Sequence, residues 1–300
     1  MSPRAAAQRR SPEVIELNGE AVEEGGSVSG AANALRALLT DRGLHYGDGL
    51  FETLACRGGA PRLLDLHLER LAHGCARLEI EPGSLDALAA DIERLASGVE
   101  RALIKVIVTR GPATARGYAP AGNEQATRVV FRYGWPDEDP SSAARGVAVR
   151  IADLAIGESP RLAGLKHLNR LEPVLARLEL RGSPFTEALL FSSSGSLVSG
   201  TMSNVFIAVG GELATPRLDR SGVAGVMRRA VMEAAARAGL GVREAQLTRA
   251  DLDAAQELFL TNARIGVWPV CALGSRMLAP GPLTRQVQAL MRPVLGGSHV

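Results

Sequence analysis

The spacing of apolar residues predicts both helices and strands in the first half of the chain. Apolar side chains recur every three or four positions from Leu64 to Leu78, the period of one helix face, and a second amphipathic helix is expected over residues 85–95. Runs of β-branched and apolar residues are typical of strands. They predict strands over residues 14–17, 50–56, 102–109 and 128–133.

Two polar features of this half need an explanation. The glycines at positions 43, 47 and 49 interrupt the helical period, so we expect residues 40–49 to form a loop that leads into strand 50–56. Lys105 falls in the middle of the apolar strand 102–109. We expect that strand to lie at the edge of a sheet, where the lysine amine can reach solvent.

The second half combines short strands with helices. The expected strands are residues 147–151, 188–191, 197–198, 204–209 and 257–261, and the expected helices are residues 167–180 and 284–294. Residues 221–227 are expected to open another helix, which runs to about residue 238. Strict βαβ alternation is missing, so the expected fold class is α+β with two lobes. The acidic, breaker-rich segment 134–145 is expected to link a lobe over 14–133 to a lobe over 146–300. Residues 1–13 are expected to form a flexible tail.

Composition narrows the class of protein. The chain has 300 residues, 46% hydrophobic and 22% charged, which is typical of a globular protein with one large or two ordinary domains. No apolar run approaches the ~18 residues that span a membrane, and no secretory signal is evident. A net charge of +2 gives no basic face for nucleic acid. Three dispersed cysteines and five histidines without ligand spacing favour a cytoplasmic protein with no metal site.

Lysine is nearly absent from the chain. Lysine and arginine together number 34, yet only Lys105 and Lys166 are lysines. A guanidinium never loses its proton, so a neutral amine that acts as nucleophile or base has to remain lysine. Lys166, expected at the start of helix 167–180 where the dipole opposes a cation, is the better candidate for a desolvated amine that forms a Schiff base. The alternative is an ordinary lysine that points to solvent.

A second candidate site lies where another helix begins. Residues 221–227 read Ser-Gly-Val-Ala-Gly-Val-Met, and their free backbone N–H groups at the positive end of the helix dipole are typical of a phosphate site. Arg70, three residues after His67 on helix 64–78, is a candidate to close this site. The alternative is that Arg70 lies on a solvated helix face.

Several motifs together resemble the fold-type IV pyridoxal-phosphate enzymes, which include D-amino-acid and branched-chain aminotransferases and the 4-amino-4-deoxychorismate lyases. They are LTDRGLHYGDGLFETL, HLERL, RGY, AGLKHLNRLEPVLAR, VSGTMSNVF, GVAGVMR and LTNARIGVWPV, spread from Val14 to about Val294. The stretch GLKHLNRLEPVLAR is similar to the lyases in particular. The resemblance implies a small N-terminal α/β lobe, a larger C-terminal pseudo-barrel lobe, pyridoxal 5′-phosphate as cofactor, and a homodimer.

The resemblance also implies roles for single residues. Lys166 matches the lysine that holds the cofactor covalently, and Arg70 matches the arginine that contacts its phosphate. Val226 and Met227 match the residues whose N–H groups surround the phosphate at the helix start. The remaining cofactor-binding residues are Ser199, Asn204 and Asn262.

Position 199 departs from the family pattern. Many relatives have a glutamate five residues before the asparagine that is Asn204 here, and that glutamate pairs with the pyridine nitrogen of the cofactor; this chain has Ser199. A carboxylate keeps the nitrogen protonated and makes the ring a strong electron sink, whereas a hydroxyl only hydrogen-bonds to it. We expect serine to suit an elimination driven by aromatisation and to disfavour transamination.

The implied reaction converts 4-amino-4-deoxychorismate to 4-aminobenzoate and pyruvate in folate biosynthesis. This small substrate has two carboxylates, so arginine donors are expected near the cofactor. The candidate substrate-binding residues are Arg116, Tyr46, Arg110, Phe51 and Arg264. The alternative is that these arginines lie on the surface and that the two aromatic residues belong to the core. Two alternatives stay open: an aminotransferase of the same fold, against which Ser199 counts, and a non-catalytic protein that binds a phosphorylated ligand, against which the retained Lys166 counts.

Overall fold

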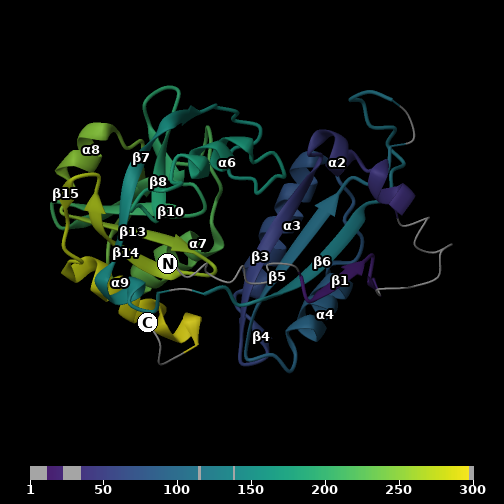
Figure 1. Ribbon diagram of the computed structural model, residues 1–300, viewed down its shortest axis with the longest axis horizontal. Helices are drawn as coiled ribbons and strands as arrows, with labels where there is room; N and C mark the ends of the chain where they lie inside the picture. The colour runs from purple at the N-terminus through teal and green to yellow at the C-terminus, as the bar shows by residue number, and fades with distance from the viewer. Residues whose placement is uncertain (1–11, 23–34, 114–115, 138, 297–300) are drawn as a thin grey trace, which may run out of the picture. The chain divides into compact units, whose positions relative to one another are not determined.

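The computed structural model describes residues 12–22, 35–113, 116–137 and 139–296 (Figure 1). Its contacts divide the chain into two units. The first comprises Met1–Leu64 and Leu71–Pro136, and the second comprises Asp65–Arg70 and Asp137–Val300. The tail expected over residues 1–13 lies outside the described residues up to position 11.

The first unit is a six-stranded antiparallel sheet in the order β2-β1-β6-β5-β3-β4. The strands are β1 (Val14–Leu17), β2 (Glu20–Ala21), β3 (Gly49–Arg57), β4 (Ala60–Pro61), β5 (Arg101–Thr109) and β6 (Thr127–Gly134). The labelled helices include α2 (Arg42–Tyr46), α4 (Leu85–Ala96) and α3 (Leu64–Leu78), whose residues Asp65–Arg70 are counted in the second unit. Alternate β5 residues from Ala102 to Val108 are buried, and α4 packs against β4, β5 and β6. The expected helices and long strands of this half are therefore confirmed.

Residues 42–46 form the short helix α2, so the expectation of a loop over residues 40–49 is wrong. The Asp41 carboxylate accepts a hydrogen bond from the Gly43 N–H (2.7 Å) and caps the first turn. Gly47, at φ +66°, ends the helix in the left-handed conformation that favours glycine. A side chain at Gly43 would place its Cβ 2.2 Å from Cγ2 of Thr109. These glycines therefore allow capping and close packing of a helix.

Lys105 does not lie on an edge strand, because β5 pairs with β3 on one side and with β6 on the other. Successive residues of a strand point to opposite faces of a sheet. Ile104 and Val106 are buried on the face that α4 covers, whereas Lys105 is half-buried on the other face. Its ammonium lies 5.6 Å from the ring centroid of Phe51, and burial lowers its pKa. Because side chains alternate between the two faces of the sheet, a lysine is tolerated on an interior strand.

The second unit is built on a nine-stranded sheet in the order β12-β11-β10-β13-β14-β7-β8-β9, with β15 paired to β14. The strands are β7 (Val147–Ile156), β8 (Glu187–Ser192), β9 (Leu197–Gly200), β10 (Asn204–Val209), β11 (Glu212–Pro216), β12 (Val242–Ala245), β13 (Glu257–Asn262), β14 (Gly266–Leu273) and β15 (Arg276–Met277). The last strand of this order, β9, lies beside β10 and β11, so the sheet curves back on itself. This is the curved sheet expected of the pseudo-barrel lobe.

Five helices described in the second unit pack against this sheet. They are α5 (Ser142–Arg145), α6 (Leu171–Leu178), α7 (Val226–Arg237), α8 (Arg249–Ala254) and α9 (Pro282–Leu295). One apolar core joins β10, β13 and β14 through Val205, Leu260 and Val270. A second core joins α6 to β7 and β8. Helix α5 occupies the end of the segment expected as a linker, so residues 134–145 are not wholly irregular.

The helix after Lys166 begins at Leu171, so the expected start at His167 is wrong. Pro173 explains the difference: proline lacks an N–H, and its ring clashes with the preceding turn inside a helix. In a helix that begins at Leu171, Pro173 falls in the first turn, where it is tolerated. Lys166 therefore lies in non-helical backbone. The expected opposition between its charge and a helix dipole is absent.

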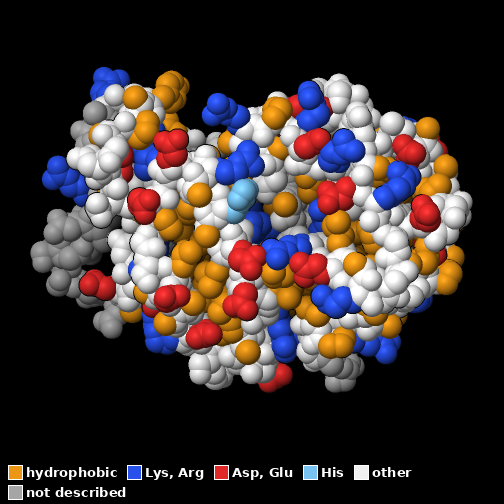
Figure 2. Space-filling view, turned by 180° about the vertical axis from the view of Figure 1, so that it is seen from behind, with side chains coloured by type: hydrophobic (Ala, Val, Ile, Leu, Met, Phe, Trp, Pro, Cys, Tyr) orange, Lys and Arg blue, Asp and Glu red, His pale blue; other side chains and the backbone are white. Residues whose placement is uncertain are grey.

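Figure 2 shows one face of the molecule with its side chains coloured by type. Acidic and basic side chains are interspersed there among apolar ones. Within the described residues, no helix combines the length and the apolar character needed to cross a membrane.

Candidate active site

The start of α7 is a buried helix N-terminus. The helix begins after Gly225, which has no side chain to cap it, and Val226 and Met227 of its first turn are buried. The first N–H groups of a helix have no partner within the helix and carry the positive end of its dipole. The start of α7 therefore has the partial positive charge that suits an anion.

Asn204 fixes the loop that leads into this helix. Its Nδ2 donates a hydrogen bond to the carbonyl of Val223 (2.9 Å), and its Oδ1 lies against Gly225. Asn204 is the first residue of β10, in the interior of the sheet. The orientation of the helix start is thus set from the sheet by one amide side chain.

Gly225→Ala is expected to destabilise this loop. An added Cβ would lie 1.9 Å from the Asn204 Oδ1 atom, so either the asparagine or the helix start has to move. Overpacking of this kind typically costs about 1–3 kcal/mol. The measurement is the free energy of unfolding in urea, with Gly241→Ala as the control, because nothing lies within 4 Å of a Cβ at Gly241. Equal effects of the two substitutions would contradict the contact.

Arg70 reaches the same loop from α3. Its Nη1 donates to the carbonyl of Ala224 (2.9 Å), directly before the start of α7. The preceding residue, Glu69, accepts a hydrogen bond from Arg229 of α7 (2.6 Å). The Arg70 guanidinium is therefore held beside the helix N-terminus.

Lys166 follows a segment that is hydrogen-bonded to this loop. Gly164 forms a parallel bridge with Val223. Its N–H donates to the carbonyl of Gly222 (3.0 Å), and its carbonyl accepts from the N–H of Ala224 (3.0 Å). Gly164 adopts φ +82°, a conformation that favours glycine. The structure thus brings the backbone of Lys166 together with Arg70 and the start of α7.

His167, next to Lys166, is held neutral. Its Nδ1 is buried with no hydrogen-bond partner among the described residues. Burial, and after it the charge of Arg170, lowers the pKa of His167 to about 4. A neutral imidazole beside Lys166 adds no positive charge to the site at neutral pH.

This histidine is expected to make the fold sensitive to acid. Its pKa lies below the ordinary value of about 6.5, so between these values the unfolded chain binds more protons and stability falls as the pH is lowered from about 6.5 towards 4. The contribution is about 2–3 kcal/mol. Urea unfolding at about pH 7 and about pH 4.5 measures it. The loss is expected to be smaller in His167→Gln and unchanged in His73→Gln, which alters an exposed residue. An equal loss in all three proteins would contradict the assignment.

Asn262 is the last residue of β13, and Arg264 lies in the turn that follows it. The Asn262 Oδ1 accepts from the N–H groups of Arg264 and Ile265 (2.9 Å each), and its Nδ2 donates to the carbonyl of Met202 (3.1 Å). The Asn262 amide therefore holds the turn in shape. The Arg264 guanidinium lies 5.7 Å from the Trp268 ring, and burial lowers its pKa.

Thr261 was not among the residues singled out from the sequence. It pairs in register with Asn204, is fully buried, and its hydroxyl has no hydrogen-bond partner among the described residues. An unpaired buried hydroxyl is costly, which makes it a candidate donor or acceptor for a ligand group. No sequence signal separates this threonine from an ordinary strand residue.

Ser199 lies in β9, half-buried, opposite Leu190 of β8. Glu187 is a buried residue of β8, the strand that pairs with β9. Its carboxylate accepts hydrogen bonds from the Thr201 hydroxyl and from the Ser203 hydroxyl (3.0 Å). It also accepts from backbone N–H groups of the turn after β9. Glu187 therefore organises that turn.

The remaining predicted residues lie in the first unit. Arg42, which is buried, donates to the carbonyls of Gly117 (3.3 Å) and Tyr118 (2.6 Å) and holds the loop of Arg116 against α2. The rings of Tyr46 and Tyr118 lie 5.3 Å apart. The structure thus brings Tyr46 and the Arg116 loop together, and Arg42 is an organising residue that sequence reasoning missed.

Arg110 and Phe51 have partners within the first unit. The Arg110 guanidinium donates to both Asp48 oxygens (2.8 and 3.1 Å) and to the carbonyls of Leu78 and Glu79 (2.7 Å each). Together with Arg42 it overcomes the burial that would raise the pKa of Asp48, and the pKa is lowered. Phe51 is half-buried beneath the Lys105 ammonium. Arg110 therefore has a structural role.

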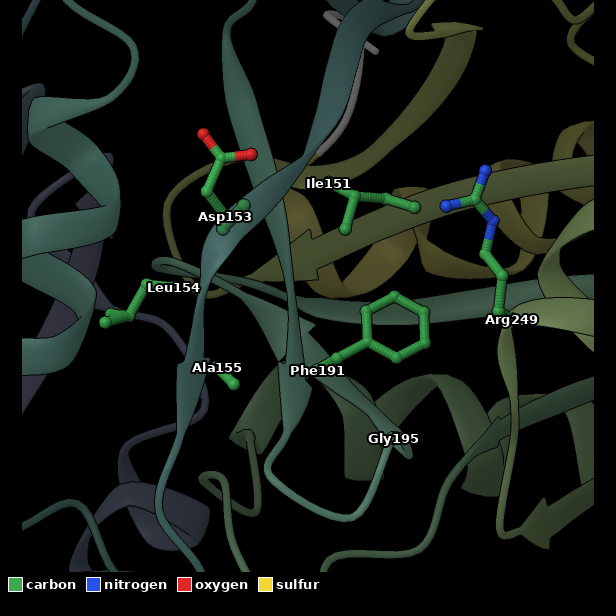
Figure 3. A pocket seen from close by; sticks show the side chains of 8 residues that line it. Ile151, Asp153, Leu154, Ala155, Phe191, Gly195 and Arg249 are labelled. Carbon is green, nitrogen blue, oxygen red and sulfur yellow. The ribbon is translucent and has the colours of Figure 1, made fainter.

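A surface hollow beside β7 lies apart from these residues. It is lined by Ile151, Ala152, Asp153, Leu154, Ala155, Phe191, Gly195 and Arg249. In Figure 3, Leu154 points away from Phe191 and Arg249. Arg249 pairs with Asp253 (2.9 Å), and Asp153 pairs with Arg150 (2.7 Å). The hollow contains none of the predicted site residues.

Within the described part of the chain, no group of His, Cys, Asp and Glu side chains could hold a metal ion.

Comparison with known proteins identifies the family of this chain. The sequence model of the class IV aminotransferases matches residues 49–273, and the chain belongs to this family. This confirms the resemblance drawn from the motifs.

Individual proteins of known activity or structure are similar to this chain over most of its length. An aminodeoxychorismate lyase of Vibrio harveyi is 34% identical over 259 residues, 83% of this chain and 93% of that protein. A D-alanine aminotransferase of Bacillus licheniformis is 28% identical and covers 85% of this chain and 90% of its own. The crystal structure of 4-amino-4-deoxychorismate lyase from Pseudomonas aeruginosa superposes with a TM-score of 0.84 at 39% identity, over 93% of this chain and 98% of that one. That similarity supports the two-lobed α+β fold.

Proposed function

We propose that the protein is an aminodeoxychorismate lyase that uses pyridoxal 5′-phosphate. The observation that carries the proposal is the convergence of Lys166, Arg70 and the start of α7 on the loop of residues 222–225. It supplies one amine and one anion site within the same unit. The similarity to two proteins named as lyases favours this reaction over others in the family.

The residues present fit the cofactor. The N–H groups of Val226 and Met227 and the guanidinium of Arg70 would hold the phosphate, because a helix start and a fixed cation together suit a dianion. Asn204 would hold the helix start in place, and the buried Thr261 hydroxyl is a further candidate donor. Asn262 would act indirectly, through the turn it closes.

In the proposed reaction the amine of Lys166 has two roles. When bound, pyridoxal phosphate supplies an aldehyde that condenses with amines and a ring that accepts electrons. Lys166 would hold the cofactor between turnovers. It would then take the proton from the substrate carbon that bears nitrogen. Loss of the enolpyruvyl ether, with a proton added to its methylene carbon, yields pyruvate and leaves an aromatic ring, 4-aminobenzoate. Proton transfer by a positioned base typically contributes about 10²- to 10⁴-fold.

Ser199 is proposed to face the pyridine nitrogen. A hydroxyl there would leave the ring a weaker electron sink than a carboxylate does. Glu187, the nearby buried acid, already accepts hydrogen bonds from Thr201 and Ser203. An elimination that gains aromaticity tolerates the weaker sink, whereas transamination does not.

Among the candidates for the substrate carboxylates, Arg116 is favoured over Arg110. Arg116 is exposed on a loop that Arg42 holds in place, beside Tyr46. The Arg110 guanidinium has its donors occupied by Asp48 and two carbonyls. Arg264, in the turn after β13, remains a second candidate in the other unit.

The decisive experiment supplies 4-amino-4-deoxychorismate to the purified chain with pyridoxal phosphate. The proposal expects 4-aminobenzoate and pyruvate in equal amounts. The second candidate function is a D-amino-acid or branched-chain aminotransferase, favoured by the relative named as a D-alanine aminotransferase. Transamination of D-alanine at a rate comparable to lyase turnover would favour it and would contradict the role given to Ser199. A chain that binds pyridoxal phosphate but turns over neither substrate would be a non-catalytic binder.

A homodimer is part of the proposal. The apolar residues of α6 recur at the period of one helix face, yet they are solvent-exposed in the single chain. Their exposed fractions are 68% for Leu171, 52% for Val174, 48% for Leu175 and 41% for Leu178. A contiguous exposed apolar patch is typical of a protein interface. We therefore propose that this face contacts a second copy of the chain.

The free cysteines Cys56, Cys75 and Cys271 support a cytoplasmic location.

Val174→Glu is expected to weaken the dimer. A charge buried in an apolar interface costs several kcal/mol, so at micromolar concentration the variant should elute as a monomer in size-exclusion chromatography with light scattering. Met277→Glu is the matched control, because Met277 is 76% exposed on β15, a different element. A dimer that survives Val174→Glu, or is lost in both variants, would contradict the α6 interface.

A further inference from the structure

The guanidinium of Arg170 binds the backbone on both sides of Lys166. Its Nη2 donates to the carbonyl of Leu165 (2.8 Å), and its Nε donates to the carbonyl of His167 (2.9 Å). A guanidinium is planar and rigid, so two of its donors fix the distance and orientation of two acceptors together. The residue between these two carbonyls is Lys166.

The same segment is fixed at its other end to the loop before α7. Gly164 exchanges hydrogen bonds with Gly222 and Ala224 (3.0 Å each), and the Leu165 N–H donates to the carbonyl of Leu162 (3.1 Å). Residues 165–166 belong to no helix or strand. Their path therefore depends on these contacts and on Arg170, because no regular hydrogen-bond ladder defines it.

The surroundings of Arg170 suit a structural cation. Burial is the main cause that lowers its pKa to about 10; the charge of Glu172 opposes the shift, and the positive charge of Arg70 adds to it. A buried guanidinium is costly unless its N–H groups are satisfied. Here the carbonyls that flank Lys166 accept hydrogen bonds from Nη2 and from Nε.

We propose that Arg170 is a positioning residue for Lys166: by binding the carbonyls of Leu165 and His167, it fixes the backbone from which the lysine amine reaches the anion site. The inference rests on the proposed function, in which Lys166 is the reacting amine. A misplacement of about 1 Å can reduce a reaction rate about 10²-fold. Arg170→Lys keeps the charge but loses the planar fork, so it should recover only part of the loss.

The presence of two lysines makes the test specific. The full chain is incubated with pyridoxal phosphate, treated with borohydride at intervals and digested, and the pyridoxyl groups on Lys166 and Lys105 are quantified by mass spectrometry. In Arg170→Gln the rate at Lys166 is expected to fall about 10-fold or more, while the rate at Lys105 stays that of the parent. Arg181→Gln removes an exposed arginine beyond α6 and should change neither rate.

Added guanidinium ion separates positioning from general stability. In Arg170→Ala, millimolar guanidinium chloride is expected to restore part of the Lys166 rate, which a loosened fold would not allow. An unchanged Lys166 rate in Arg170→Gln, or equal losses at Lys166 and Lys105, would overturn the role of Arg170 and leave the proposed function standing. Failure of the parent chain to be modified at Lys166 would overturn the proposed function, and the role of Arg170 with it.

Discussion

Lys166→Ala is expected to abolish formation of 4-aminobenzoate and the visible absorbance of bound cofactor. In the proposed reaction the lysine amine both holds the cofactor and moves the proton, and alanine can do neither. Proton transfer alone accounts for about 10²- to 10⁴-fold, so with the covalent role lost the rate should fall by about 10⁴-fold or more. The measurements are product formation and the absorbance spectrum after addition of pyridoxal phosphate.

The other lysine of the chain provides the matched control. Lys105→Arg changes a half-buried lysine on β5, in the first unit, and should leave the cofactor absorbance intact. Borohydride should bleach the band in the parent and in this control. If the band persisted in Lys166→Ala, the cofactor would be held elsewhere and the assignment of the site would be wrong.

The sequence predicted elements best where one periodicity dominates. Helices α3, α4, α7 and α9 and strands β5, β6, β10 and β13 follow their apolar patterns closely. Strand β14 was missed because Pro269 lies inside it and its residues are nearly all buried, so it shows neither alternation nor an uninterrupted run. Proline usually argues against a central strand. Here Pro269 is paired in register with Phe259 of β13, and the pairing is visible only in three dimensions.

The positions of the candidate site residues depend on contacts between residues that are distant in the sequence, and a local sequence pattern does not predict such contacts. The sequence singles out Lys166 by residue type, but the backbone of Lys166 is set by the bridge between Gly164 and Val223 and by Arg170, not by a helix start. Residue type alone did not distinguish Arg110, held by Asp48, from the exposed Arg116. Residues that act through long-range hydrogen bonds are therefore the ones that sequence reasoning misses.

Arg70→Gln is expected to weaken binding of pyridoxal phosphate about 10²-fold. Hydrogen bonds to a charged group contribute about 1.5–3 kcal/mol, and each 1.4 kcal/mol is about tenfold in affinity. Arg70 lies against the carbonyl directly before α7, where its charge adds to the helix dipole. The dissociation constant is measured by titrating the full chain with cofactor and following absorbance.

Arg229→Gln is the control that separates a specific contact from a general loss of charge. Arg229 is in the first turn of α7 but forms exposed ion pairs with Glu69 (2.6 Å) and Glu233 (2.8 Å). Its loss should change the affinity only about twofold, because exposed pairs contribute little. Inorganic phosphate should compete with the cofactor in the parent and in Arg229→Gln, and much less in Arg70→Gln. Equal weakening in both variants would mean that the helix start attracts anions through its overall potential and that Arg70 has no specific role.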